Sequence, residues 1–127
     1  VEREVMAAIL NTLPVELSFV DKDDTVRYFS HENGEKIFGR TRGVIGVAVQ
    51  NCHPQKSVHL VNRILEDFKA GRRKAAEFWI DMGGRKVHIR YFPVRHPAGE
   101  YLGTLEVVQD ITAIRQLTGE RRLRAEE

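Results

Sequence analysis

The strongest constraint on the fold is the strand-like sequence on both sides of Gly83-Gly84. Between residues 85 and 95, Val, Ile and Tyr first alternate with Lys, His and Arg. A period of two is typical of a β-strand that buries one face, and a two-glycine turn is typical of a tight hairpin. We therefore expect residues 74–82 to pair antiparallel with residues 85–95.

Three further segments are predicted to be strands. Glu16–Asp21 and Thr25–Phe29 flank the turn-forming pair Asp23-Asp24. Glu100–Gln109 follows His96-Pro-Ala-Gly99, which is typical of a turn. Short connections of this kind favour antiparallel pairing, so the sequence predicts a five-stranded antiparallel sheet.

Apolar residues at steps of three and four predict helices elsewhere in the chain. One amphipathic helix is predicted over residues 2–12, where Pro14 stops it. A longer helix is predicted to begin at Pro54 and to close at Gly71. Strands grouped on either side of a central helical region indicate an α+β fold.

Two less regular segments complete the prediction. Ser30 is expected to cap a short helix that runs through Phe38, and residues 111–127 are expected to form a charged helix. The domain organisation that follows is an N-terminal flanking helix at 1–13, one domain at 14–112 and a C-terminal linker helix at 113–127.

Composition restricts the class of protein. The chain has 127 residues, 42% hydrophobic and 30% charged, with a formal net charge of +2, which fits one globular domain. Its basic residues are interspersed with acids, so we expect no nucleic-acid partner. No apolar run approaches the ~20 residues that span a bilayer, so we expect no membrane partner. The single cysteine, Cys52, favours a cytoplasmic location, and the missing initiator Met suggests a fragment of a longer protein.

Three motifs in order resemble the PAS domain family. They are Ser18-Phe-Val-Asp21, Phe38-Gly39 through Ile45-Gly46, and Gly103 through Asp110-Ile111-Thr112. The last is similar to the Asp-Ile-Thr ending of the final PAS strand. Asn51-Cys-His-Pro54 and Glu77-Phe-Trp-Ile80 further resemble the C-terminal PAS domain of prokaryotic proteins that also carry a hemerythrin-like domain.

The resemblance implies a sensory or regulatory module rather than an enzyme. PAS domains bind small ligands between the sheet and the central helices, and they signal through flanking helices that often dimerise. We therefore expect a small-molecule ligand, the other domains of the parent protein and a second copy of the chain as partners. The alternative is a ligand-free module for protein interaction or dimerisation, in which Trp79 lies on an exposed sheet face.

His59 is the most specific cofactor candidate, because heme-binding PAS domains carry their axial histidine on the corresponding helix with a similar spacing from proline. A neutral imidazole is a good iron ligand. Arg90 is a candidate partner for the heme propionates. The alternative is that His59 is a surface or partly buried helix residue that binds no ligand. The expected apolar walls of the pocket are Val58, Leu60, Val61, Ile64, Phe78 and Ile80.

Other chemistry is less well supported. Asn51-Cys52 matches part of the flavin-binding signature of blue-light sensors, but the residues that follow do not, so flavin is not expected. Cys52 is a redox candidate because His53 and the helix start at Pro54 can lower a thiol pKa. Adjacent Cys52 and His53 lack the paired spacing of a structural zinc site. The sequence contains neither a phosphate-binding loop nor a nucleophile motif, so we do not expect catalysis.

Overall fold

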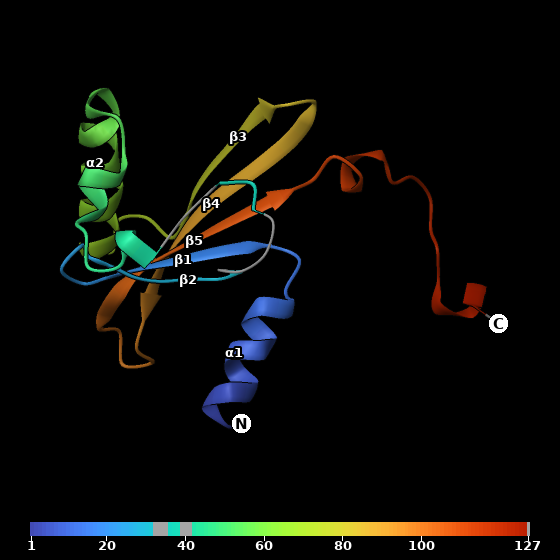
Figure 1. The fold of residues 1–127 in the computed structure, drawn as a ribbon, viewed down its shortest axis with the longest axis horizontal. Helices are drawn as coiled ribbons and strands as arrows, with labels where there is room; N and C mark the ends of the chain where they lie inside the picture. Colours follow the sequence, from blue (N-terminus) through green and yellow to red (C-terminus); the bar gives the residue numbers. More distant parts are fainter. Residues whose placement is uncertain (32–35, 39–41, 127) are drawn as a thin grey trace.

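The computed structural model describes residues 1–31, 36–38 and 42–126. Five strands and two α-helices form the body of the protein, and short 3-10 helices (η) connect and follow them (Figure 1). The elements are α1 (Arg3–Thr12), β1 (Glu16–Asp21), β2 (Val26–Phe29), η1 (Arg42–Val44), η2 (Val49–Cys52), η3 (Gln55–Ser57), α2 (Val58–Lys69), β3 (Ala76–Met82), β4 (Arg85–Arg95), β5 (Tyr101–Asp110), η4 (Ile114–Gln116) and η5 (Leu123–Glu126).

The five strands form one sheet in the order β2-β1-β5-β4-β3, and each neighbouring pair is antiparallel. The first and last strands in sequence, β1 and β5, are therefore adjacent at the centre. This arrangement confirms the predicted α+β fold with a five-stranded antiparallel sheet.

Glycines allow two features of the sheet that other residues resist. Gly83 and Gly84 have φ values of 57° and 79°, as the predicted β3–β4 hairpin turn requires. Gly103, with φ 155°, lies where β1 and β5 approach closely. A Cβ at this position would be 2.2 Å from the carbonyl oxygen of Val20. The close approach therefore depends on a residue without a side chain.

The helix α2 covers one face of the sheet through a single apolar edge (Figure 1). Leu65 and Phe68 are buried, and Phe68 is 0% exposed. The helix ends before Gly71, whose φ of 75° breaks the helical path. Arg95 of β4 donates a hydrogen bond to the carbonyl of Phe68, which satisfies one of the terminal carbonyls that a helix leaves unpaired. Helix and sheet are thus joined by an apolar contact and a polar one.

Two predicted helical features differ from the structure in detail, and a third falls partly outside the described residues. The long helix begins at Val58 rather than at Pro54, because a separate 3-10 turn at Gln55–Ser57 precedes it. The Ser30 hydroxyl is buried and accepts a hydrogen bond from the amide of Leu17, so it ties β2 to β1 across the sheet. Residues 32–35 of the short helix predicted through Phe38 lie outside the described residues.

The predicted charged helix at 111–127 is also wrong. Within residues 111–126 the structure has only the 3-10 turns Ile114–Gln116 and Leu123–Glu126. The exposed side chains of Ile114 and Leu117 find no packing partner that would stabilise a longer helix. The segment leaves the sheet at the end of β5 and extends away from it (Figure 1).

The helix α1 precedes β1 and projects away from the sheet, and it buries none of its residues (Figure 1). Its apolar stripe, Val5, Met6, Ile9 and Leu13, is exposed. His31, at φ 57°, fixes its end, because the imidazole Nε2 lies 3.0 Å from the carbonyl oxygen of Leu13. In the described part of the chain, no helix has both the length and the apolar character needed to cross a membrane.

Candidate functional site

A cavity of about 710 Å³ lies between the sheet and the segments that cover it. The sheet forms its floor, with residues from β1, β2, β3, β4 and β5. The roof comes from α2 and from the irregular segments between β2 and α2. Most of the lining is apolar, including Val20, Val26, Val47, Val49, Ile64 and Leu65. The volume and lining are typical of a small-molecule site.

The roof is attached to the β1–β2 hairpin by backbone hydrogen bonds. The amide of Val26 donates to the carbonyl of Val47 at 2.9 Å, and the amide of Val49 donates to the carbonyl of Asp24 at 2.8 Å. Asp24 adopts φ 65°, a conformation that Asp tolerates better than most residues. These contacts place Val47 and Val49, two of the lining valines of the roof, above the floor.

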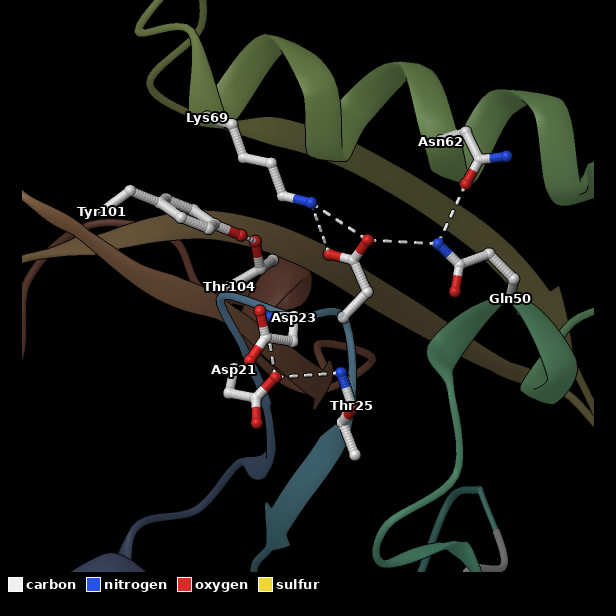
Figure 2. A network of polar contacts seen from close by, with 9 residues as sticks. Asp21, Asp23, Thr25, Gln50, Asn62, Lys69, Tyr101 and Thr104 are labelled. Atoms are coloured by element: carbon white, nitrogen blue, oxygen red, sulfur yellow. Dashed lines mark hydrogen bonds and ion pairs between the residues drawn. The ribbon is translucent and has the colours of Figure 1, made fainter.

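A polar network next to the cavity joins three elements (Figure 2). Lys69 of α2 lies 2.9 Å from Asp24 Oδ1 and 3.0 Å from Oδ2. Gln50 of η2 donates to Asp24 at 3.3 Å and to Asn62 of α2 at 3.0 Å. The Asp24 carboxylate and the Gln50 amide therefore hold the β1–β2 hairpin, η2 and α2 together. A movement of α2 must strain or break these contacts.

The polar groups of the lining occupy two places. On the floor are Ser18, Thr104, Glu106 and Tyr91, and in the segment from η2 to η3 are Asn51, Cys52, His53 and Ser57. The hydroxyls of Thr104 and Tyr101 are 2.8 Å apart. Burial raises the pKa of the Tyr101 phenol, and the hydrogen bond with Thr104 opposes this shift. The phenol consequently stays neutral at physiological pH and can act as a hydrogen-bond donor.

The structure brings together half of the predicted pocket residues. Leu60, Val61, Ile64 and Phe78 line the cavity. The other four predicted residues, Val58, His59, Ile80 and Arg90, are not among its lining residues. For His59 and Arg90 the difference follows from periodicity, since adjacent positions of a helix or a strand point in different directions. Ile80 shares the strand face of Phe78 but lies two residues further along β3.

A heme bound as predicted does not fit this arrangement. His59 is exposed and lies outside the cavity lining, although its neighbour Leu60 is part of it. Arg90 lies between Ile89 and Tyr91, which both line the cavity, so it points to the opposite face of the strand. Neither the axial ligand nor the propionate partner is positioned for that role.

Cys52 and His53 do lie at the cavity, but without the geometry of a metal site. The thiol of Cys52 is exposed and is 3.8 Å from the carbonyl oxygen of Ala48. His53 Nδ1 lies 3.0 Å from the carbonyl oxygen of Val49. Within the described ranges, no group of three or more His, Cys, Asp and Glu side chains could hold a metal ion. The redox role of Cys52 stays a prediction.

Sequence reasoning missed the polar floor. Ser18 and Glu106 belong to motifs that resemble PAS domains, and Tyr91 belongs to an alternating strand. None of these patterns indicates a polar residue in a cavity. The available signal was an acid flanked by apolar residues within Leu105–Val108, which is unusual for a buried strand. The side of the sheet that faces the cavity could not be derived, because period two gives alternation but not direction.

Comparisons with known proteins agree with this geometry. A family model described as PAS domain matches residues 6–112. The C-terminal domain of a Streptococcus mutans protein is 35% identical, with a TM-score of 0.85 and coverage of 93% of this chain and 91% of that one. Among functionally curated proteins, none matches the chain.

More distant structures share the fold. The PAS domain of Bordetella pertussis BvgS has a TM-score of 0.62 at 20% identity, covering 89% of this chain and 91% of that one. The PAS domain of the histidine kinase ThkA has a TM-score of 0.56 at 16% identity, covering 76% of this chain and 98% of that one. The family match over residues 6–112, together with the sheet and its cavity, shows that the chain belongs to the PAS domain family.

Proposed function

We propose that this PAS domain is a non-catalytic sensory module that binds a small, largely apolar molecule in the cavity. The observation that carries the proposal is the cavity of about 710 Å³ with aliphatic walls between sheet and α2. Apolar ligands gain free energy by leaving water for such a site, at roughly 25 cal/mol per Å² of buried surface. Shape and apolar contact therefore supply affinity without any catalytic group.

Signal transfer is proposed to run from the roof to the ends of the domain. A ligand that contacts α2 and η2 changes the balance between alternative positions of these segments, as any ligand with unequal affinity for two states does. At the far end, Ile111 donates a backbone hydrogen bond to Lys86 and the Thr112 hydroxyl accepts one from the Lys86 amide, each at 2.9 Å. The end of β5 is thereby fixed to β4, so sheet movements reach the C-terminal segment.

The proposed partners are other domains of a parent protein. Solved relatives include PAS domains of histidine kinases, and a sensor needs an output domain to act on. We infer the same organisation here, in a cytoplasmic protein. Association with a hemerythrin-like domain stays a prediction.

Ligand binding is tested with naphthalene, an uncharged and apolar aromatic molecule. We expect saturable binding with one site per chain, measured by isothermal titration calorimetry. Ile64→Trp should abolish it, because Ile64 lines the cavity and the larger side chain fills the space. Ile114→Trp is the matched control, since Ile114 is exposed in the C-terminal segment.

Two outcomes would count against this function. Absence of saturable binding to the native domain would remove the ligand-binding role. Equal affinity in Ile64→Trp and native protein would place the bound probe somewhere other than the cavity. Circular dichroism of the variants establishes that both are folded.

A second proposal is that α1 mediates homodimerisation. Its stripe of Val5, Met6, Ile9 and Leu13 is exposed, and an exposed apolar stripe on a helix is a common dimer contact. Ile9→Glu should convert a dimer to a monomer in light-scattering measurements, whereas Ala7→Glu, outside the stripe, should leave it intact. A native protein that is already monomeric at high concentration excludes this role for α1.

A further inference from the structure

Two hydroxyl groups meet where the cavity floor borders the polar network (Figure 2). Thr104 of β5 lines the cavity and is 5% exposed. Tyr101, three residues earlier in the same strand, is not among the lining residues. The two hydroxyl oxygens are 2.8 Å apart, and either can be the donor. The pair therefore links the interior of the cavity to a side chain outside it.

The pair holds two protons, but only one of them can lie between the two oxygens. Each hydroxyl carries one donor proton and accepts hydrogen bonds through its lone pairs. Burial raises the pKa of the Tyr101 phenol, so the phenol keeps its proton at neutral pH. Nowhere in the described structure does either side chain make another hydrogen bond. The second proton therefore lacks an acceptor, which is unfavourable for a buried hydroxyl.

Tyr101 is the better donor of the two and is held in place. A phenol is more acidic than an aliphatic hydroxyl, so it donates the stronger hydrogen bond. The guanidinium carbon of Arg95 lies 5.7 Å from the centre of the Tyr101 ring, and the same guanidinium donates to the carbonyl of Phe68 at the end of α2. We infer that Tyr101 donates to Thr104, which leaves the Thr104 proton without an acceptor.

The surroundings of Thr104 direct this proton into the cavity. The residues directly opposite Thr104 are Val20 of β1 and Pro93 of β4. Such residues share a face of the sheet, and neither of these side chains can accept a hydrogen bond. Since Thr104 is buried and lines the cavity, a bound molecule is placed to supply the acceptor.

We propose that Thr104 donates a hydrogen bond to the ligand, and that this cavity selects largely apolar molecules with an acceptor oxygen, as ketones, aldehydes and esters have. The chain of bonds runs from the Tyr101 hydroxyl to the Thr104 oxygen, and from the Thr104 hydroxyl to the ligand. Consecutive hydrogen bonds of this kind strengthen one another. This inference rests on the proposed ligand-binding function and specifies the chemical class of the ligand.

Two probes of nearly equal shape isolate this hydrogen bond. In 2-acetonaphthone the aromatic body carries a C=O group, and in 2-isopropenylnaphthalene a C=CH2 group replaces it. Titration calorimetry gives the ratio of the two dissociation constants in the native domain and in Thr104→Val. Comparing the two ratios cancels the different hydration of the probes. The preference for the ketone should be about three- to tenfold larger in the native domain, the effect of one net hydrogen bond.

Further variants separate Thr104 from its neighbour. Thr104→Ser keeps a hydroxyl and should restore the native preference. Tyr101→Phe leaves the Thr104 proton in place, so the preference should stay within about twofold of the native value. Thr118→Val is the matched control, because Thr118 is exposed in the C-terminal segment and does not line the cavity. Thr104→Ala, which also lacks the hydroxyl, replaces Thr104→Val if circular dichroism shows that variant to be unfolded.

The outcomes distinguish this inference from the function on which it rests. An unchanged preference in Thr104→Val, or its loss in Tyr101→Phe, overturns the role of Thr104 while ligand binding stands. Failure of both probes to bind the native domain overturns the inference alone if naphthalene still binds. It overturns the proposed function as well if naphthalene does not bind.

Discussion

The floor of the cavity is held by backbone hydrogen bonds along five antiparallel strands, whereas the helix α2 in the roof is anchored mainly by side chains. Leu65 and Phe68 anchor α2 by burial, and the Asp24–Lys69 pair adds a polar attachment at its end. Backbone ladders tolerate many side-chain substitutions, while individual anchors do not. The difference indicates that displacing α2 requires less free energy than disrupting the sheet.

The largest expected effect comes from the apolar anchor. Phe68→Ala removes a side chain that is 0% exposed, which should lower the free energy of unfolding by about 3–5 kcal/mol. Hydrogen exchange should rise most in α2 and least in the central strands. Leu60→Ala on the same helix, where Leu60 is 49% exposed, should cost much less in urea denaturation. Similar losses in the two variants would remove the distinction between anchor and surface.

Substitution of Gly103 tests whether the sheet tolerates side-chain changes as well as its backbone hydrogen bonds suggest. Gly103→Ala places a Cβ 2.2 Å from the Val20 carbonyl oxygen, so we expect a loss of about 2–3 kcal/mol in urea denaturation. Gly99→Ala is the control, because Gly99 also has a positive φ, 102°, but its Cβ meets open space. If both variants lose the same stability, backbone conformation rather than strand contact explains the effect.

The two buried serines give a smaller and sharper comparison within the floor. Ser30→Ala should lower the free energy of unfolding by about 1–3 kcal/mol, because the Leu17 amide loses its acceptor. Ser18→Ala should change it by less than about 0.5 kcal/mol, since its hydroxyl has no partner to lose in the described residues. Thermal and urea denaturation of both variants provide the measurement. A large loss in Ser18→Ala would show that its hydroxyl is bonded within the protein.

The smallest expected effect is that of the polar attachment of the roof. Lys69→Met removes the ion pair with Asp24, for which we expect about 0.2–1 kcal/mol because Lys69 is partly exposed. The loss should diminish in high salt, where surface charges are screened. A loss that is independent of salt would indicate that packing of the Lys69 stem, rather than its charge, attaches the roof.

Prediction from the sequence succeeded for the floor and largely failed for the roof. Alternation and the pair Gly83-Gly84 identify strands because their cause is local. The segment before α2 is positioned by distant contacts, such as the bridge between Thr25 and Ala48, which no local pattern reveals. The C-terminal helix was wrong because charged residues with helical propensity do not form a helix without a surface to pack on.

The sequence correctly predicted that α2 contributes to the site, but it did not show which face of the helix lines the cavity. His59 and Leu60 are adjacent in sequence, yet only Leu60 lines the cavity. A rotation of about 100° per residue separates them, and the sheet that determines the inward direction is formed largely by strands that follow in the chain. The polar floor was missed for a similar reason, because the neighbours of Glu106 in the sheet, Ser18 and Tyr91, come from other strands.

Cys52 gives this protein a practical property. It is the single cysteine of the chain, it is exposed, and it forms part of the cavity lining. A thiol-reactive fluorophore would therefore attach at one position, beside the site, without any substitution elsewhere. The chain can thus be labelled at the edge of the cavity without any substitution, which provides an optical readout for the binding experiments proposed above.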